Sequence, residues 1–352
     1  MIFYFFLSLV VSIIFTVIVS KIASKYNIID IPDGDRKKHR RKVPLLGGVA
    51  IFLSFWLVVG YSFFFTDLIA KNIQPTQLLW ALVGSLLLIL FGIFDDIKSI
   101  SPLLRLIVSS LAVILVMMGG VGLISITNPL GGIIGLDFWQ INFSGLGNFL
   151  VAADLLVFFW LMGMTHTTKI LDGLDGLSTG VVAIGAMMIF FLTSTTKFFQ
   201  PDVRLIALIL AGVCVGFLIF NFFPAKIFLG ESGGLFLGFI LGVLAIIAGG
   251  KIATALLVMA VPIMDLILVI WQRFKAGQPI FKGDRRHLHF RLVDRGFTQR
   301  QSVLFLYLVA FLFGVTTLIL PSLYKMITLL ILIVLFIILE KKLCPSNPAT
   351  NG

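Results

Sequence analysis

The sequence predicts an all-α polytopic integral membrane protein with about eleven transmembrane helices. Of its 352 residues, 59% are hydrophobic and only 12% are charged, with a mean hydropathy of +1.11. Soluble domains are about 45–50% apolar and about 25% charged. Apolar runs of about 20 residues, the length that crosses a bilayer, recur along the chain. No polar stretch between them is long enough to bury a core, so we expect no separate soluble domain.

The predicted spans follow one another with polar loops between them. The first has no small-residue cleavage site and continues into a basic loop, which indicates a retained helix rather than a signal peptide. The eighth and ninth meet at Gly249-Gly250-Lys251, where their division is open. The predicted spans cover residues 2–20, 46–65, 77–94, 103–121, 148–164, 177–194, 203–222, 234–250, 252–271, 302–320 and 323–339.

The 27 Lys and Arg residues are shared unequally between the two sides of these spans. Lys and Arg collect in cytoplasmic loops, so we expect the N-terminus outside and the C-terminus inside, with residues 341–352 as a cytoplasmic tail. Because the charge follows topology and anionic lipid headgroups, the net charge of +11 does not indicate nucleic-acid binding. The basic residues on the opposite side are Lys71, Lys197, Arg204, Lys251 and Lys325.

Four polar islands and all four histidines fall on the predicted cytoplasmic side. The islands are residues 95–98, 165–178, 230–233 and 284–291. Acidic residues at a membrane edge are costly to keep there without a task, so we expect the active site on these cytoplasmic loops. The outer segment 122–147 lacks Lys and Arg, and its alternation predicts a short outer β-hairpin. The histidines are His39, His166, His287 and His289.

The first two islands carry paired carboxylates. Asp95 and Asp96 are adjacent, so on a helix they point about 100° apart and cannot share one task. One could hold a metal while the other meets a second substrate, and the alternative is a helix-end cluster neutralised by Lys98. Asp172 and Asp175 are three residues apart and share a face on a helical turn. The alternative for Asp175 is a cap on the next helix.

The other two islands offer sites for anions. Residues 230–233 precede a span, and a helix N-terminus suits phosphate, with Ser232 as N-cap and Glu231 near a cation. The alternative there is a capped turn. Residues 284–291 combine three Arg with two His, which favours an anion clamp over a zinc site, because zinc takes three or four ligands. There, and in the basic loop 35–48, the alternative is charge that only sets topology.

Carboxylates beside cationic groups on one membrane face are typical of phosphoryl transfer. Mg²⁺ bridges carboxylates and substrate phosphates, and such reactions need charge neutralisation and in-line positioning. The many membrane helices indicate that one substrate is a lipid. Asp265, inside the ninth span, could join the site or be a buried hydrogen-bonded carboxylate.

Four motifs resemble those of the polyprenyl-phosphate N-acetylhexosamine-1-phosphate transferases of glycosyltransferase family 4. They are residues 94–98 (FDDIK), 172–180 (DGLDGLSTG), 221–233 (NFFPAKIFLGESG) and 284–292 (DRRHLHFRL). The resemblance spans residues 1–320 and is greatest to the undecaprenyl-phosphate N-acetylglucosamine-1-phosphate transferase branch, which starts O-antigen, teichoic acid and related cell-envelope glycans. It implies transfer of an N-acetylhexosamine 1-phosphate from a UDP-sugar to undecaprenyl phosphate, with release of UMP.

The resemblance also implies a role for each matching residue, within one transmembrane catalytic domain over residues 1–340. Asp95 and Asp96 would be catalytic with the lipid phosphate, and Asp172 and Asp175 at the nucleotide-sugar site. Mg²⁺, or alternatively Mn²⁺, would be held by Glu231 with Asp96. The partners would be UDP-N-acetylhexosamine, undecaprenyl phosphate and the bilayer of a bacterial cytoplasmic membrane, with a homodimer left open. Substrate-binding roles are implied for His39, Lys98, Lys169, Asn221, Lys226, Arg285, His287, His289 and Arg291.

Three positions depart from the family pattern and bear on the identity of the sugar. Glu231 stands where the family has Asp, Lys169 where it commonly has Asn, and Phe290 where it has a second adjacent His. Lys169 could pair with Asp172 or with a diphosphate. Two other functions stay open: a membrane transporter, and a catalytically weakened binder of nucleotide sugar or lipid phosphate. Spans nearly free of charge favour the enzyme, because transporters place ionisable residues near the membrane midplane.

Overall fold

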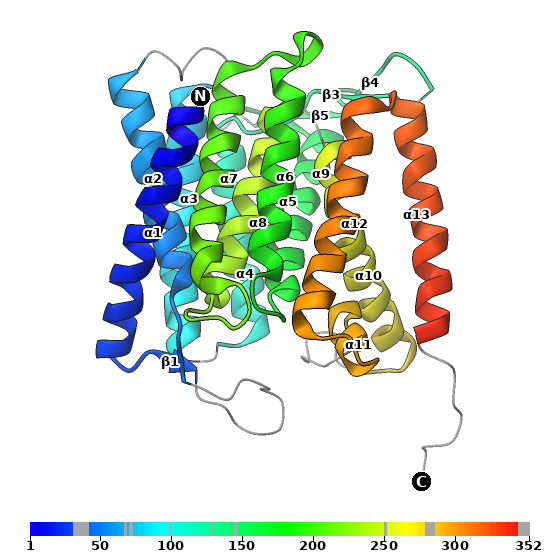
Figure 1. The fold of residues 1–352 in the computed structure, drawn as a ribbon. Helices are drawn as coiled ribbons and strands as arrows, with labels where there is room; N and C mark the ends of the chain where they lie inside the picture. Colours follow the sequence, from blue (N-terminus) through cyan, green and yellow to red (C-terminus); the bar gives the residue numbers. More distant parts are fainter. Residues whose placement is uncertain are drawn as a thin grey trace.

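Long helices run between two ends of the molecule, with short strands near those ends (Figure 1). Within the described residues the chain forms thirteen α-helices and six short strands. The computed structural model describes residues 1–30, 42–66, 69, 73–98, 100–128, 130–143, 147–249, 252–278 and 286–343.

Every apolar segment expected to be a span forms a helix or a pair of helices. The helices are α1 (Ile2–Lys25), α2 (Gly47–Phe65), α3 (Pro75–Ile97), α4 (Pro102–Met118), α5 (Val151–Leu171), α6 (Leu177–Ser194), α7 (Pro201–Asn221), α8 (Gly230–Ile247), α9 (Ile252–Val258), α10 (Ala260–Lys275), α11 (Leu288–Asp294), α12 (Gln299–Ile319) and α13 (Ser322–Leu343). The strands are β1 (Ile29–Asp30), β2 (Val43–Pro44), β3 (Ser125–Thr127), β4 (Ile133–Gly135), β5 (Gln140–Phe143) and β6 (Gly147–Leu150).

In the described part of the chain, eight helices are long and apolar enough to cross a membrane, or nine spans if α9 and α10 count as one. The predicted number of eleven is therefore not confirmed. α4 is a shorter apolar helix, and so is the described part of α13, Ser322–Ile338. The ninth predicted span is broken, because α9 and α10 meet at 75°. Pro262 lies in the first turn of α10, where its missing N–H costs no helical hydrogen bond.

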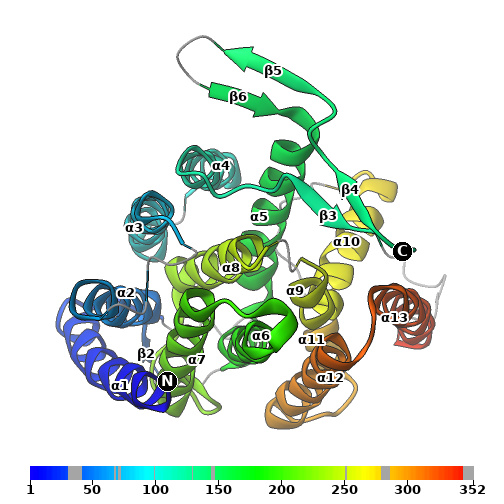
Figure 2. The same ribbon diagram turned by 90° about the horizontal axis from the view of Figure 1, so that it is seen from above.

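The segment between α4 and α5 forms two antiparallel hairpins, where the sequence predicted one. β3 pairs with β4, with Ile126 opposite Ile134, and β5 pairs with β6, with Ile141 opposite Phe149. Seen along the helices, the β5–β6 hairpin reaches sideways beyond the bundle (Figure 2). Both hairpins lie at the end of the bundle opposite to α11 (Figure 1).

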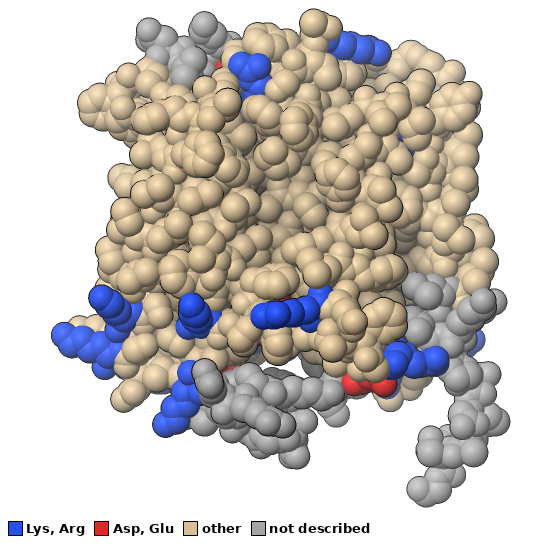
Figure 3. All heavy atoms as spheres, in the orientation of Figure 1, with Lys and Arg blue, Asp and Glu red and all other residues tan. Residues whose placement is uncertain are grey.

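The polar islands collect at one end of the bundle, which we call the acidic end. There α3, α5 and α7 end, α4, α6 and α8 begin, and α11 packs below α10 and α12 (Figure 1). On the face drawn in Figure 3, Lys and Arg side chains line this end, and few lie at the opposite end. The unequal charge expected from the sequence thus coincides with the acidic end.

α8 lies in the middle of the bundle, and small residues let its neighbours approach its first turns (Figure 2). A Cβ at Gly48 of α2 would overlap Gly233, and a Cβ at Gly92 of α3 would overlap Ser232. Such small residues are typical of contacts between membrane helices, which associate by close packing. The start of α8 is therefore fixed against α2 and α3, and its backbone N–H groups face the end of α3.

Candidate active site

Asp95 is locked in an ion pair with Arg105. The guanidinium donates to both carboxylate oxygens, with Nη2 2.8 Å from Oδ1, and the N–H of Ile100 donates to Oδ1 at 2.9 Å. The planar fork of arginine permits this two-point contact. Ser101 caps α4 and Pro102 takes its first position, which places Arg105 in the first turn of the helix. The Asp95 side chain is fully buried, whereas 21% of the Arg105 side chain is exposed.

Asp96 meets a different partner, the first turn of α8. It accepts hydrogen bonds from the N–H of Glu231 at 2.8 Å and from Ser232 Oγ at 3.1 Å. The expectation that the two adjacent carboxylates point apart is confirmed. The expected N-cap role of Ser232 is wrong, because α8 already begins at Gly230 and its N-cap, Leu229, has no capping side chain. A carboxylate is favourable at a helix N-terminus. Here the Asp96 carboxylate occupies the position at which the sequence suggested a bound phosphate.

Lys169, in the last turn of α5, forms an ion pair with Glu231 in the first turn of α8. Lys169 Nζ lies 2.8 Å from Glu231 Oε2. The sequence left Asp172 or a diphosphate as its partner, and the structure places it on Glu231 instead. One residue earlier, Thr168 Oγ1 donates to the Gly234 carbonyl at 2.8 Å, which joins the two helices at the same level.

Asp172 and Asp175 lie in a non-helical turn between α5 and α6, rather than on the shared helix face that their spacing suggested. Burial raises the pKa of Asp172 well above the usual aspartate value, and the carboxylates of Glu231 and Asp175 raise it further. Asp175 Oδ2 accepts a hydrogen bond from the N–H of Ala225 at 2.9 Å, which ties the turn to the loop before α8. The alternative that Asp175 caps α6 is wrong, because the N-cap is Gly176, with a φ of 80°.

The predicted anion loop meets the bent pair α9–α10 through Asp265. Asp265 Oδ2 lies 2.8 Å from His287 Nδ1, and Oδ1 accepts a hydrogen bond from the N–H of Leu288 at 2.9 Å. The alternative of a buried hydrogen-bonded carboxylate is confirmed for Asp265, and its partners belong to the predicted anion loop. Burial lowers the pKa of His289 to about 3, so this imidazole is uncharged at physiological pH.

The remaining predicted residues are placed less closely around these carboxylates. Asn221 is buried, and both ends of its amide are used inside the fold: Nδ2 donates to the Ile227 carbonyl at 3.0 Å, and Oδ1 accepts from Thr179 Oγ1 at 3.2 Å. Lys98 and Lys226 are exposed near the acidic end. Arg291 lies on α11 and is partly exposed, whereas His39 and Arg285 lie outside the described residues.

Sequence reasoning missed one residue of the site, Arg105. A usable signal was present, since Arg105 follows Asp95 and Asp96 across a short turn with a Ser-Pro helix start between them. A lone arginine one turn into the next helix can fold back onto a carboxylate that ends the helix before it.

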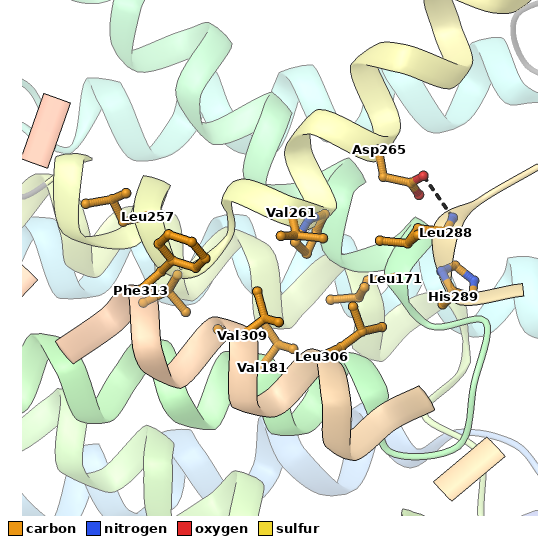
Figure 4. A pocket seen from close by; sticks show the side chains of 13 residues that line it. Leu171, Val181, Leu257, Val261, Asp265, Leu288, His289, Leu306, Val309 and Phe313 are labelled. Carbon is orange, nitrogen blue, oxygen red and sulfur yellow. Dashed lines mark hydrogen bonds between the residues drawn. The ribbon is translucent and has the colours of Figure 1, made fainter. Parts of the chain in front are cut away.

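An apolar pocket lies beside the bend of α9 and α10 (Figure 4). It is lined by residues of α5, α6, α9, α10, α11 and α12, and its polar end is formed by Asp265 and His289. Side chains that line its apolar part include Val181, Leu257, Val261, Leu306, Val309 and Phe313.

The donor set at the acidic end suits a metal ion that is shared with a substrate. The described residues contain no group of three or more His, Cys, Asp or Glu side chains that could hold a metal by themselves. Mg²⁺ commonly takes only one or two protein carboxylates and completes its shell with phosphate and water. Asp96 accepts the backbone N–H of Glu231, and the Glu231 carboxylate pairs with Lys169, so two carboxylates belong to the first turn of α8 and its partners. These two side chains are the ones that could hold such an ion together with substrate phosphates.

These observations define a polytopic membrane protein with a carboxylate-rich, cation-lined site at one end of its helices. The family model described as "Glycosyl transferase family 4" matches residues 78–249, and the chain belongs to this family. It is 30% identical over 346 residues to a Bacillus subtilis (strain 168) protein named "Probable undecaprenyl-phosphate N-acetylglucosaminyl 1-phosphate transferase", covering 96% of this chain and 89% of the relative.

Other relatives carry related names. The chain is 30% identical to "Decaprenyl-phosphate N-acetylglucosaminephosphotransferase" of Mycobacterium tuberculosis (strain CDC 1551 / Oshkosh), over 82% of this chain and 75% of the relative. It is 28% identical to "Undecaprenyl-phosphate alpha-N-acetylglucosaminyl 1-phosphate transferase" of Escherichia coli (strain K12), over 82% of this chain and 76% of the relative. The family and branch indicated by the motifs are thereby confirmed.

Proposed function

We propose that this protein transfers N-acetylglucosamine 1-phosphate from UDP-N-acetylglucosamine to undecaprenyl phosphate, which starts a lipid-linked cell-envelope glycan. In the reaction, an oxygen of the lipid phosphate forms a bond to the β-phosphorus of the nucleotide sugar. The bond between that phosphorus and the oxygen bridging to the α-phosphate breaks, and UMP leaves. The observation that carries the proposal is the convergence of the family's carboxylate motifs on the first turn of α8.

In this proposal, different carboxylates act on the two substrates. Asp96 and Glu231 would hold Mg²⁺, which when bound neutralises phosphate charge and aligns the reacting groups. Asp95 would act through Arg105, because its carboxylate holds the guanidinium fork in place and leaves a partly exposed cation for a phosphate. Asp172, whose pKa is raised by burial, would hold a proton more readily than an ordinary aspartate beside the nucleotide sugar.

The distribution of basic residues supports a membrane orientation. Lys and Arg side chains line the acidic end, and such residues mark the cytoplasmic side. The protein would therefore lie in a bacterial cytoplasmic membrane with its N-terminus outside, its C-terminus inside, and the active site open to cytoplasmic UDP-sugars.

UMP release by the purified protein in detergent tests the proposal. The assay contains undecaprenyl phosphate, one of several UDP-N-acetylhexosamines, and either Mg²⁺ or a chelator. Release that requires both lipid and Mg²⁺, and that occurs with UDP-N-acetylglucosamine, is the expected result. Release from a different epimer would identify that sugar, instead of N-acetylglucosamine, as the one transferred. Binding of a donor without UMP release from any of them would make the protein a binder and not an enzyme.

A further inference from the structure

Asp265 is a buried carboxylate with both of its oxygens in use. It is 5% exposed, lies in the second turn of α10, and receives the N–H of Leu288 on Oδ1 at 2.9 Å (Figure 4). Its other oxygen, Oδ2, lies 2.8 Å from His287 Nδ1. Leu288 and His289, at the start of α11, are 3% and 2% exposed, so the beginning of this helix is buried. A buried carboxylate is costly unless it is fully bonded, and here both bonds go to the same loop.

These contacts set the position of the hydrogen on the His287 ring. An ionised carboxylate only accepts hydrogen bonds, so His287 Nδ1 must carry the hydrogen that it shares with Asp265. In the neutral ring the lone pair then lies on Nε2. We propose that Asp265 is a positioning residue that holds His287 in this tautomer, so that Nε2 accepts a hydrogen bond from an N–H or O–H group of the transferred sugar. This deepens the proposed function and rests on it.

His289 packs beside His287 and against the turn that carries Asp172 and Asp175. The rings of His287 and His289 lie parallel, with an angle of 1° and a centroid distance of 5.7 Å. His289 Nε2 is buried without a hydrogen-bond partner among the described residues, and a Cβ at Gly173 in that turn would overlap it. The imidazole pair therefore adjoins the turn at the proposed nucleotide-sugar site, and Asp265 ties this pair to the bent membrane helix.

The tautomer can be observed directly, because the chain has only 4 histidines. Long-range proton–nitrogen NMR of protein labelled with nitrogen-15 histidine, at a pH where free imidazole is neutral, separates rings that carry hydrogen on Nδ1 from those that carry it on Nε2. Loss of signals in His287→Gln assigns the ring. In the unmodified protein, we expect hydrogen on Nδ1 of His287. Hydrogen on Nε2 would overturn the proposal without any variant.

The variant Asp265→Asn provides a second test of the proposal. The carboxamide can still accept from Leu288, but its NH₂ group donates to His287 Nδ1, so the hydrogen moves to Nε2. We expect this change together with a loss of about 10- to 100-fold in kcat/KM for the UDP-sugar, the range seen when a partner that orients a histidine is removed. The KM for undecaprenyl phosphate should not change. An unchanged spectrum or unchanged donor kinetics would contradict the positioning role.

The control is Asp154→Asn, at the opposite end of the bundle. Asp154 Oδ2 accepts the N–H of Leu150 at 2.9 Å at the start of α5, so it has a comparable capping contact and no histidine. This variant should leave the imidazole signals and the kinetics unchanged. The spectrum does not depend on turnover: an inactive unmodified protein would refute the proposed function, whereas the His287 tautomer would still decide the role of Asp265.

Discussion

Lys169 Nζ lies 2.8 Å from Glu231 Oε2, so an ammonium group occupies the carboxylate that we propose as a ligand for Mg²⁺. The two side chains are 16% and 33% exposed, and they join the end of α5 to the start of α8. The sequence singled out both residues as departures from the pattern of the resembling family, and in the structure they contact each other. In the proposed site, the ammonium would compete with a divalent ion for the Glu231 carboxylate.

Replacing Lys169 by Met should therefore increase the affinity for divalent ions. Removal of the competing cation frees Glu231, and the half-saturating Mg²⁺ concentration should fall by up to about 5-fold, since partly exposed ion pairs contribute up to about 1 kcal/mol. Titration of UMP release with Mg²⁺, and of Mn²⁺ binding by electron paramagnetic resonance, would measure the shift. Lys25→Met, which changes an exposed lysine in the last turn of α1, should leave both titrations unchanged. A weaker affinity in Lys169→Met would show that the ammonium supports ion binding.

Removing Arg105 should lower the stability of the folded protein more than removing an exposed arginine does. Arg105→Met leaves the fully buried Asp95 carboxylate without its partner, and breaking a buried pair costs roughly 3–5 kcal/mol. Detergent-based thermal unfolding should show a lower midpoint than for Arg300→Met, which removes only an exposed contact to the Phe223 carbonyl. Adding Asp95→Asn to Arg105→Met should restore part of the loss. If the double variant is no more stable than the single one, the penalty is not the unpaired charge.

The acidic pair illustrates what the sequence could predict. Adjacent residues on a helix point apart, so the separate partners of Asp95 and Asp96 followed from helix geometry alone. The contacts of Lys169 with Glu231 and of Asp265 with His287 did not follow, because each joins segments whose distance is decided by helix packing. The break between α9 and α10 was missed for a related reason: a continuous apolar run has the same composition whether its helix is straight or bent by 75°.

Removing divalent ions should abolish activity without unfolding the protein. The donor set at the acidic end is too small to hold a structural metal in the described part of the chain, so the ion would enter with substrate phosphates. Chelation should stop UMP release, Mg²⁺ or Mn²⁺ should restore it, and the thermal midpoint without substrate should stay the same. A large fall of that midpoint in chelator would instead reveal a metal that stabilises the fold.

Carboxamides in place of the acidic pair should stop the reaction. In Asp96→Asn the side-chain oxygen can still accept from the N–H of Glu231, so α8 should remain in place while a charged ligand is lost. We expect no UMP release from Asp95→Asn combined with Asp96→Asn, and at least a 100-fold loss from Asp96→Asn alone, about the size of one lost electrostatic contact in a transition state. Normal turnover in the double variant would remove these residues from the mechanism.

Asp172 should make the folded protein less stable as the pH rises. Its pKa is raised in the folded state, mainly by burial, so between the unfolded value of about 3.9 and the raised value the folded state binds more protons than the unfolded state. The stabilisation from its proton is complete below about pH 4 and is lost as the pH increases through the raised pKa.

Asp172→Asn removes this ionisation and tests the sign. The stability of the variant relative to the unmodified protein, measured as the difference in thermal midpoint, should increase as the pH rises from about 4 toward the raised pKa. UMP release should be lost at every pH, because the uncharged amide cannot take up a proton. A difference in midpoint that shrinks as the pH rises would mean that Asp172 is stabilised in its ionised form.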